Sequence, residues 1–397
     1  MQCTRKVTDG IYWVGANDRR LAKFENMFPI PRGVSYNSYV ILDGKTALMD
    51  TADSSVAERF MENVAAVLDG RALDYLVVQH MEPDHCANIA AIIEKYPDVT
   101  VVGNAKTMQM IGQFYSGTKA KHTLLVKEGD KLPLGEHELT FVTAPMVHWP
   151  EVMVSYESKE KILFSADAFG TFGALNGALF DDEIFFDAIW MEDARRYYTN
   201  IVGKYGPQVQ ALLKKAAALD IRVICPLHGP VLSENLSYYL NLYNTWSSYA
   251  VETDGIVVAY TSVYGNTKRA VERLISGLRT NGCPNIAVYD LARCDMSAAV
   301  ADASRYGKLV LASATYNADV FPFMKSFIEH LTERNYQKRT IGVIENGSWA
   351  PTAARVMTGM FEKSKNITWL EHSVKIMSSL SEENEKELDA MAEELCK

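Results

Sequence analysis

Residues 75–86 read YLVVQHMEPDHC, in which an apolar run of strand type leads directly into a dense group of metal-ligand side chains. These side chains belong to His80, Glu82, Asp84 and His85. Because they lie in a tight turn after a buried strand, they can diverge toward two neighbouring ions. Pro83 restricts the turn and helps to fix the directions of the ligands. The stretch therefore predicts a two-metal site.

Three later apolar runs also end on a residue that can bind a metal. The runs at 139–142, 162–164 and 221–224 lead to His148, Asp167 and His228, respectively. Strands that deliver polar residues at their carboxyl ends are a common way to build a site on a sheet. For any one of these histidines taken alone, a structural role is the safer interpretation. Four of the chain's eight histidines fall in this one pattern, however, and the set favours a metal site.

The order H-x-E-x-D-H, followed by His, Asp and His after later strands, resembles the metallo-β-lactamase fold. Zinc-binding members of that fold usually have histidine where this chain has Glu82. Four imidazoles and three carboxylates suit a di-iron centre that cycles between ferrous and ferric states. The resemblance implies one iron on His80, Glu82 and His148. It implies a second iron on Asp84, His85 and His228, with Asp167 as the bridge and no catalytic residue beyond these ligands.

A second motif lies about 180 residues downstream, between an apolar run at 256–260 and a helical pattern at 268–278. This loop consists of Ser262, Val263, Tyr264, Gly265, Asn266 and Thr267. Backbone N–H groups and the hydroxyls of Ser262 and Thr267 can surround a phosphate at the N-terminus of the helix. Gly265 supplies either a close approach or a positive φ. The loop resembles that of flavodoxins, many of which have a small hydroxyl residue in place of Tyr264.

Two further loops follow the apolar runs at 309–311 and 341–344. The candidate flavin contacts in them are Ala314, Thr315, Tyr316 and Asn317, and then Asn346, Gly347, Ser348 and Trp349. A doubly wound sheet binds its ligand beyond the carboxyl ends of its strands, where these loops are expected. Tyr316 or Trp349 can cover a face of the isoalloxazine ring, or simply pack the loops. The three loops together predict a flavin site, and the absence of a G-x-G-x-x-G motif argues against a nicotinamide site.

The pattern of apolar runs changes near residue 251, and two domains are expected from a chain of 397 residues. Residues 1–250 are expected to form an αββα sandwich of the metallo-β-lactamase type. Residues 255–397 alternate strictly between strand, loop and helix, which predicts a flavodoxin-like doubly wound parallel sheet. The fold class is therefore a combination of α+β and α/β.

The net charge of −9 argues against general nucleic-acid binding, which needs clustered positive charge. No apolar run reaches the roughly 18 residues of a membrane span. Residues 1–10 lack the apolar core of a signal peptide, so a cytoplasmic location is expected. The six cysteines form no C-x-x-C pair, which excludes a rubredoxin-type iron centre and fits a reducing compartment.

All these motifs, in this order, resemble the flavodiiron proteins, also called A-type flavoproteins. The resemblance covers essentially the whole chain, including the segment Gly33–Tyr39. It implies reduction of O2 to water, of NO to N2O, or of both, with electrons that pass from a donor such as rubredoxin through FMN to two irons. It also implies a head-to-tail homodimer, in which each FMN lies beside the partner's irons. Trp149, Tyr197 and residues 24–31 are candidates for the wall of the gas pocket.

Two other functions stay open. One is a dizinc hydrolase of the metallo-β-lactamase type with an accessory flavodoxin-like domain, against which Glu82 and the intact phosphate loop argue. The other is an electron carrier with an inert scaffold, against which the complete ligand set argues. The sequence does not distinguish O2 from NO as the preferred substrate.

Overall fold

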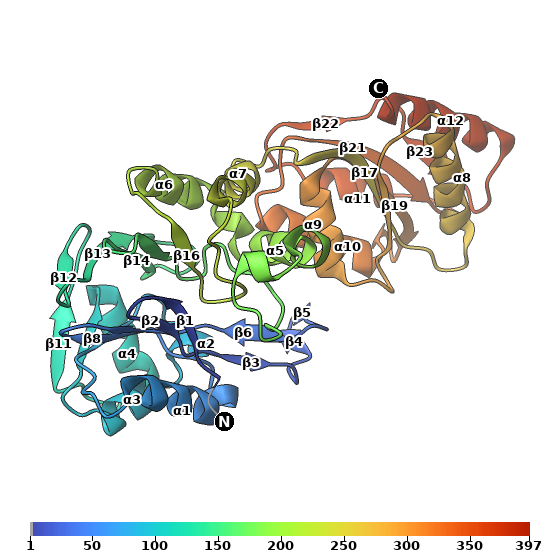
Figure 1. Cartoon of the computed structure of the whole chain (residues 1–397). Helices are drawn as coiled ribbons and strands as arrows, with labels where there is room; N and C mark the ends of the chain where they lie inside the picture. Colours follow the sequence, from blue (N-terminus) through green and yellow to red (C-terminus); the bar gives the residue numbers. More distant parts are fainter. Residues whose placement is uncertain (1–2) are drawn as a thin grey trace. The chain divides into compact units, whose positions relative to one another are not determined.

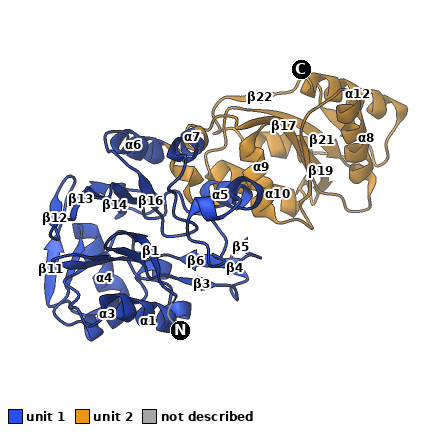
Figure 2. Ribbon diagram, viewed as in Figure 1, with its two compact units in different colours: residues 1–198, 207–244 blue, residues 199–206, 245–397 orange. Residues whose placement is uncertain are grey.

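The computed structural model describes residues 3–397 and divides into two compact units (Figures 1 and 2). Unit 1 runs up to Tyr198 and resumes over Pro207–Asn244, and unit 2 comprises Thr199–Gly206 and Thr245–Lys397. Part of the segment 251–255, which the sequence suggests as a boundary, already belongs to strand β17. The domain limits 1–250 and 255–397 stay a prediction.

Unit 1 is built on two mixed sheets that follow each other in the chain. The first has the order β1-β2-β7-β8-β9-β10-β11, and its strands span Arg5–Thr8, Ile11–Trp13, Tyr39–Leu42, Thr46–Met49, Tyr75–Val77, Thr100–Gly103 and His122–Leu125. The second has the order β12-β13-β14-β15-β16, with strands at Lys131–Pro133, Glu138–Thr143, Met153–Glu157, Ile162–Phe164 and Val223–Cys225. Each sheet begins with antiparallel pairs and becomes parallel from β8 and β15 onward.

The core of unit 1 lies between the two sheets. Ile11 and Trp13 of the first sheet share one buried cluster with Phe141 and Phe164 of the second. Because side chains alternate between the two faces of a strand, the intervening residues point to the outer faces. In Figure 1 the helices α1, α3 and α4 accompany the first sheet and α6 accompanies the second. The expected αββα sandwich is confirmed.

The remaining elements of unit 1 are helices and short hairpins. The helices are α1 (Ala57–Leu68), α2 (Pro83–Cys86), α3 (Ile89–Lys95), α4 (Ala105–Phe114), α5 (Met191–Tyr197), α6 (Gly206–Ala216) and α7 (Leu236–Ser247). Two short pairs join β3 (Ala16–Asp18) to β6 (Val34–Tyr36) and β4 (Lys23–Phe24) to β5 (Phe28–Pro29). Single turns of 3-10 helix lie at Ser54–Val56 and Asp181–Glu183, and a π-helical turn lies at Phe186–Trp190. A second π-helical turn (Tyr198–Val202) and a 3-10 turn (Gly203–Tyr205) fall almost wholly in the short segment Thr199–Gly206, which belongs to unit 2.

Unit 2 is a parallel sheet with the order β18-β17-β19-β21-β22, and β23 also pairs in parallel with β21. The strands are β17 (Thr253–Tyr260), β18 (Ile286–Asp290), β19 (Tyr306–Tyr316), β20 (Asp319–Val320), β21 (Arg339–Asn346), β22 (Ile367–Trp369) and β23 (Val374–Ile376). The helices are α8 (Asn266–Thr280), α9 (Met296–Arg305), α10 (Pro322–Glu333), α11 (Ala353–Met360) and α12 (Glu382–Leu395).

The two faces of this sheet have separate cores. Val257 and Leu309 belong to the cluster formed with α9, α10 and α11, whereas Val258 and Val310 belong to the cluster formed with α8 and α12. Consecutive residues thus alternate between two helix layers, which explains why the strands are apolar throughout. The expected doubly wound sheet is confirmed. Across residues 3–397, no helix combines the length and apolar character that a bilayer crossing requires.

Candidate functional site

The candidate metal ligands of unit 1 come from the carboxyl ends of strands in both sheets. His80 follows β9, and the tight turn expected after this strand contains the single helical turn α2. Pro83 occupies the first position of this helix, where its missing N–H costs nothing. Glu82 precedes it with extended backbone angles, so its side chain leaves the turn in a different direction from those of Asp84 and His85.

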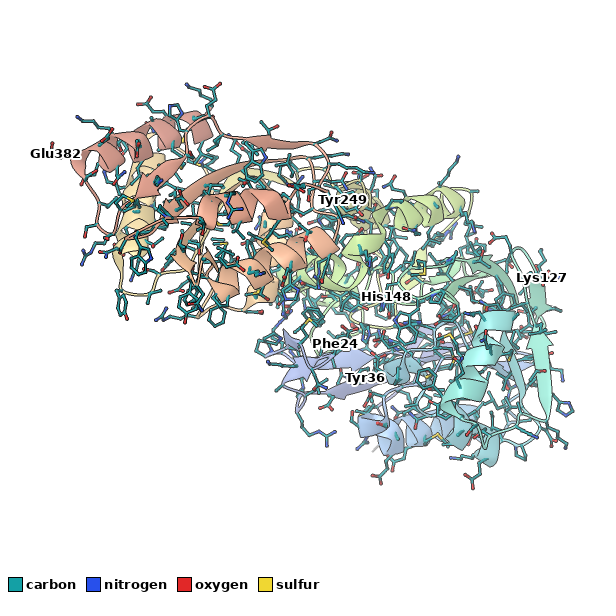
Figure 3. All side chains as sticks on the ribbon, turned by 180° about the vertical axis from the view of Figure 1, so that it is seen from behind. Phe24, Tyr36, Lys127, His148, Tyr249 and Glu382 are labelled. Carbon is teal, nitrogen blue, oxygen red and sulfur yellow. The ribbon has the colours of Figure 1, made fainter. Side chains whose placement is uncertain are left out.

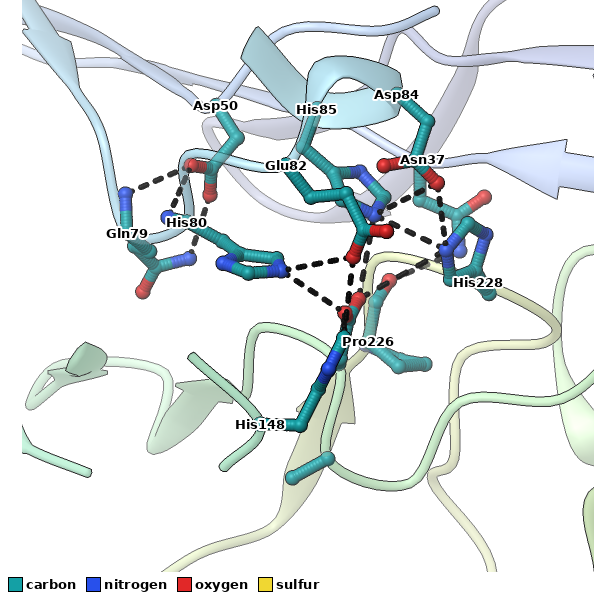
Figure 4. A network of polar contacts seen from close by, with 12 residues as sticks. Asn37, Asp50, Gln79, His80, Glu82, Asp84, His85, His148, Pro226 and His228 are labelled. Carbon is teal, nitrogen blue, oxygen red and sulfur yellow. Dashed lines mark hydrogen bonds and ion pairs between the residues drawn. The ribbon is translucent and has the colours of Figure 1, made fainter. Parts of the chain in front are cut away.

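The structure brings all seven predicted ligands together in two groups. One group contains His80, Glu82, His148 and Asp167, and the other contains Asp84, His85 and His228. In the first group, Nε2 of His148 lies 3.1 Å from Oε2 of Glu82. In the second, Nε2 of His228 lies 3.2 Å from Oδ2 of Asp84, and Nε2 of His85 lies 3.4 Å from the same oxygen (Figure 4). The spacing fits one cation in the centre of each group.

Asp167 faces both groups with different oxygens. Its Oδ2 lies 3.3 Å from Nε2 of His80 and 3.1 Å from Nε2 of His148. Its Oδ1 lies 3.2 Å from Nε2 of His85. A carboxylate that offers one oxygen to each group has the geometry of a bridging ligand, as the family resemblance implied.

The polar atoms of the cluster fit metal ions better than they fit one another. Both carboxylate oxygens of Asp84 and Oδ1 of Asp167 are buried and accept no hydrogen bond within residues 3–397. The Nε2 atoms of His85 and His228 approach to 3.0 Å, and at most one proton fits between them. Buried charges are costly unless they are paired or coordinate a metal. A cation in each group satisfies these atoms together.

The charges of the cluster depend strongly on one another. Burial alone raises the pKa of Asp167, but the nearby His85 and His80 and the hydrogen bond from His148 hold it well below its usual range. Burial lowers the pKa of His148, but hydrogen bonds to Asp167 and Glu82 raise it to about 9. The metal-free site therefore favours an ionised Asp167 and a protonated His148, whose Nε2 is the atom that faces the metal position.

Metal removal is expected to make the stability of the protein depend on pH between 6.5 and 9. His148 has a raised pKa in the folded metal-free protein. Its contribution to the free energy of unfolding is therefore complete below pH 6.5 and is lost as the pH rises through about 9. The loss is on the order of 3 kcal/mol. Thermal unfolding of metal-free protein should show it, whereas the metal-loaded protein should be nearly flat over this range. Equal slopes for the two forms would contradict the proposed role of His148.

Aromatic side chains surround the cluster. The rings of Phe24 and Tyr36 lie 5.4 and 5.9 Å from the ring of His228, and the ring of Tyr197 lies 5.5 Å from it. Figure 3 labels Phe24 and Tyr36 together with the metal-ligand candidate His148. The ring of Trp149 lies 5.4 Å from His80. Trp149, Tyr197 and Phe24, three of the residues suggested for a gas pocket, therefore lie beside the metal ligands. The side chain of Glu25 lies at the same place, and burial together with the charge of Glu82 raises its pKa to about 7.

Two buried carboxylates beside the ligands were missed at the sequence level. Asp50 accepts hydrogen bonds from the backbone N–H and side chain of Gln79 and from the backbone N–H of His80. Glu151 accepts hydrogen bonds from Nδ1 of His80 and the backbone N–H of Met81. Asp50 directly follows strand β8, and Glu151 lies just before strand β14. These positions are the only indication in the sequence, and they do not reveal which residues the two carboxylates contact.

The three predicted flavin loops of unit 2 lie at the carboxyl edge of its sheet. The register pairs Tyr260 with Ala312 and Ala314 with Asn346, so the ends of β17, β19 and β21 are neighbours. Val263 and Tyr264 lie in the first loop, and Asn266 and Thr267 open helix α8. The structure thus brings the candidate residues of all three loops to one edge, while their contacts with a flavin stay a prediction.

The first loop has the features of a phosphate cradle. Oγ of Ser262 accepts hydrogen bonds from the backbone N–H groups of Gly265 and Lys268, which leaves its own proton available to a ligand. Gly265 has φ +94°, and a Cβ there would meet no protein atom within 4 Å. Of the two roles open for this glycine, the structure supports the positive φ. The exposed N-terminus of a 15-residue helix completes an anion site.

The aromatic candidates of the other loops are open to solvent. Tyr264 is 92% exposed, Trp349 is 81% exposed and Tyr316 is 47% exposed, so a bound ring can cover them. Thr315 caps helix α11 through the backbone N–H groups of Thr352 and Ala353.

Ser378 was not a sequence candidate, but it is part of the same edge. Its backbone N–H and C=O bond the side-chain amide of Asn346, and its Oγ donates to Oγ of Ser348. Asn346 also reaches Thr267 of the first loop, with its Nδ2 3.5 Å from the threonine hydroxyl. The edge is therefore cross-linked between loops that are far apart in the sequence.

The fold and the site together define a class: a metallo-β-lactamase-like unit with a two-metal cluster, joined to a flavodoxin-like unit. Comparison with known proteins agrees. The family model described as "ODP family beta lactamase" matches residues 34–229, and one described as "Flavodoxin domain" matches residues 257–380.

Individual relatives match most or nearly all of the chain. A nitric oxide reductase from Moorella thermoacetica is 32% identical over 329 residues, which are 82% of this chain and 81% of the relative. The structure of rubredoxin oxygen:oxidoreductase from Desulfovibrio gigas superimposes with a TM-score of 0.93 and 26% identity, over 99% of this chain and 98% of that one. The flavodiiron protein from Giardia intestinalis gives 0.92 and 25%, over 99% and 96%. This chain belongs to the flavodiiron protein family.

Proposed function

We propose that this protein reduces O2 to water, NO to N2O, or both, at a di-iron centre in unit 1, with electrons that arrive through FMN in unit 2. One observation carries the proposal: two buried groups of histidines and carboxylates share Asp167, in a chain that also has a flavodoxin unit. When bound, the iron pair supplies the redox and Lewis-acid chemistry and FMN supplies the electrons. The relatives named nitric oxide reductase and rubredoxin oxygen:oxidoreductase support this assignment.

Residues of unit 1 would hold the metals. Asp84, Asp167 and Glu82 contribute three carboxylates, which favour the higher charge of an oxidised iron pair over the constant charge of zinc. Phe24 and Tyr197 lie beside His228, so part of the wall next to the metals is aromatic, while the carboxyl group of Glu25 lies beside Glu82. The donor set therefore fits iron, and the dizinc hydrolase is the weaker alternative.

The assembly and the electron donor are further parts of the proposal. We expect a head-to-tail homodimer, because in this family the two cofactors of one chain are far apart and the partner's FMN closes the gap. A symmetric pair of contacts of this kind closes on itself. Rubredoxin or a similar protein is the proposed donor, and the cytoplasm is the proposed location. Normal turnover by an isolated monomer would contradict the dimer.

The decisive experiment combines metal analysis with rapid kinetics. Protein produced without added zinc should contain two irons per chain and one FMN. After anaerobic reduction of the flavin, stopped-flow addition of O2 and of NO in separate runs should reoxidise it, and the faster gas at catalytic yield is the substrate. Protein with zinc alone, whose flavin neither gas reoxidises, would overturn the oxidoreductase in favour of the hydrolase.

A further inference from the structure

The imidazoles of the metal cluster differ in what their second ring nitrogen contacts. Nδ1 of His80 donates to Oε1 of Glu151 at 2.9 Å, and both side chains are fully buried. Nδ1 of His228 donates to the backbone carbonyl of Ser35 at 2.7 Å. Nδ1 of His85 is buried without a hydrogen-bond partner in the part of the chain that the structure describes. Of these three fully buried histidines, only His80 is backed by a full negative charge.

Further hydrogen bonds fix Glu151 beside His80. The same Oε1 accepts a second hydrogen bond from the backbone N–H of Met81 at 2.8 Å. The backbone carbonyl of Glu151 accepts a hydrogen bond from Nδ2 of Asn104 at 2.6 Å. Its other oxygen, Oε2, is buried and accepts no hydrogen bond from residues 3–397, so no second donor there offsets its charge. Asp50, the other buried carboxylate nearby, contacts the backbone of His80 and not its ring.

A carboxylate behind a metal-bound imidazole has two effects. It fixes the tautomer and the orientation of the ring, and it makes the metal-facing nitrogen a stronger donor. Removal of such a partner typically costs about 10- to 100-fold in metal affinity. In this protein, the effect applies to the group of His80, Glu82 and His148. The histidines of the other group, His85 and His228, have no carboxylate behind them in the described contacts.

We propose that Glu151 is a positioning residue that makes the two metal positions unequal. It fixes His80 with the proton on Nδ1 and strengthens Nε2, so the ion held with Glu82 and His148 binds more tightly and is oxidised more easily than its neighbour. In a one-electron-oxidised pair, the ferric ion then lies on the His80 side. This inference rests on the proposed di-iron function and adds which of the two irons is oxidised first.

The test compares Glu151→Gln with a matched control. Glutamine keeps an oxygen that accepts from His80 and Met81 but removes the charge. Glu157→Gln is the control, because Glu157 is equally buried and accepts from Nδ1 of His137 at 3.0 Å, a histidine that is not a metal ligand. Each purified protein is titrated with a chelator while the iron content per chain is measured. Midpoint potentials and Mössbauer spectra of the half-oxidised state are recorded in parallel.

We expect Glu151→Gln to lower the affinity of the iron held with His80 by about 10- to 100-fold. The wild type should therefore lose its two irons in two separate steps, and the variant should lose both at similar chelator concentrations. The midpoint potential should rise, and the ferric signal should spread over both positions. Glu157→Gln should keep both affinities and the spectrum of the wild type, even if its unfolding temperature falls. If Glu151→Gln does not fold, Glu151→Asp takes its place, because it keeps the charge but lengthens the contact, and an intermediate loss of affinity is expected.

The failure of this inference is distinct from failure of the proposed function. If Glu151→Gln keeps wild-type affinities, potentials and spectra, the inference is overturned, while two irons and gas reduction in the wild type leave the function intact. If the wild type binds only zinc, the function fails. The chelator titration with zinc then still reports whether Glu151 makes the two positions unequal.

Discussion

Replacement of Asp167 by alanine is expected to abolish gas reduction and to remove most of the bound iron. Asp167 offers one oxygen to each metal group, so its loss affects both ions at once. Partners in the outer shell of metal sites contribute about 10- to 100-fold, and a shared direct ligand should exceed this range. We therefore expect turnover to fall by at least about 100-fold, measured as O2 and NO consumption beside the iron content per chain.

Asp181→Ala serves as the control for this variant. Asp181 is also a buried aspartate of unit 1, but it accepts hydrogen bonds from the backbone N–H groups of Ser233 and Glu234 and not from a histidine. Its replacement should lower the unfolding temperature and leave two irons in place. An Asp167→Ala protein that retains turnover would contradict the bridge and would favour a simple electron carrier.

The substitution Asn266→Asp should strengthen the fold of unit 2 and at the same time expel FMN. Asn266 is the first residue of α8, where a negative charge interacts favourably with the helix dipole by about 0.3–1 kcal/mol. The same charge lies in the proposed phosphate loop, and like charges in contact cost several kcal/mol. FMN affinity should therefore fall roughly 100-fold or more. Fluorescence titration of the flavin-free protein measures the affinity, and thermal unfolding measures the stability.

The opposite signs of the two effects make this variant informative. A protein that is merely damaged would lose both stability and flavin. Asn266→Gln, which keeps the residue neutral, should bind FMN within a few-fold of the wild type. If Asn266→Asp binds FMN as tightly as the wild type, the phosphate does not lie at this loop.

Much of the candidate site can be read from the sequence, because its residues sit next to strand ends. His80, Asp167 and His228 each follow an apolar run directly, and parallel or neighbouring strands bring their ends together. The first phosphate loop is local in the same sense, since Ser262 and Lys268 bond within six positions. These features depend on short stretches of chain, whose preferences are set by the residues themselves.

Other features could not be predicted, because they join distant parts of the chain. Glu151 contacts His80 across 71 positions, and Ser378 contacts Asn346 across 32. Each contact requires the packing of separate strands and loops in one particular register. Neither residue belongs to a recognisable motif, so only the folded arrangement reveals it.

The sequence by itself therefore determined the types of the metal ligands, the alternation of strands and helices in unit 2 and the phosphate loop. Each of these follows from local residue chemistry and from hydrophobic periodicity. Only the tertiary structure decided that Asp167 faces both metal groups and that His80 alone among the fully buried ligands has a carboxylate behind it. The physical reason is that these properties are distances between side chains from two packed sheets, and no short stretch of sequence contains both ends of such a distance.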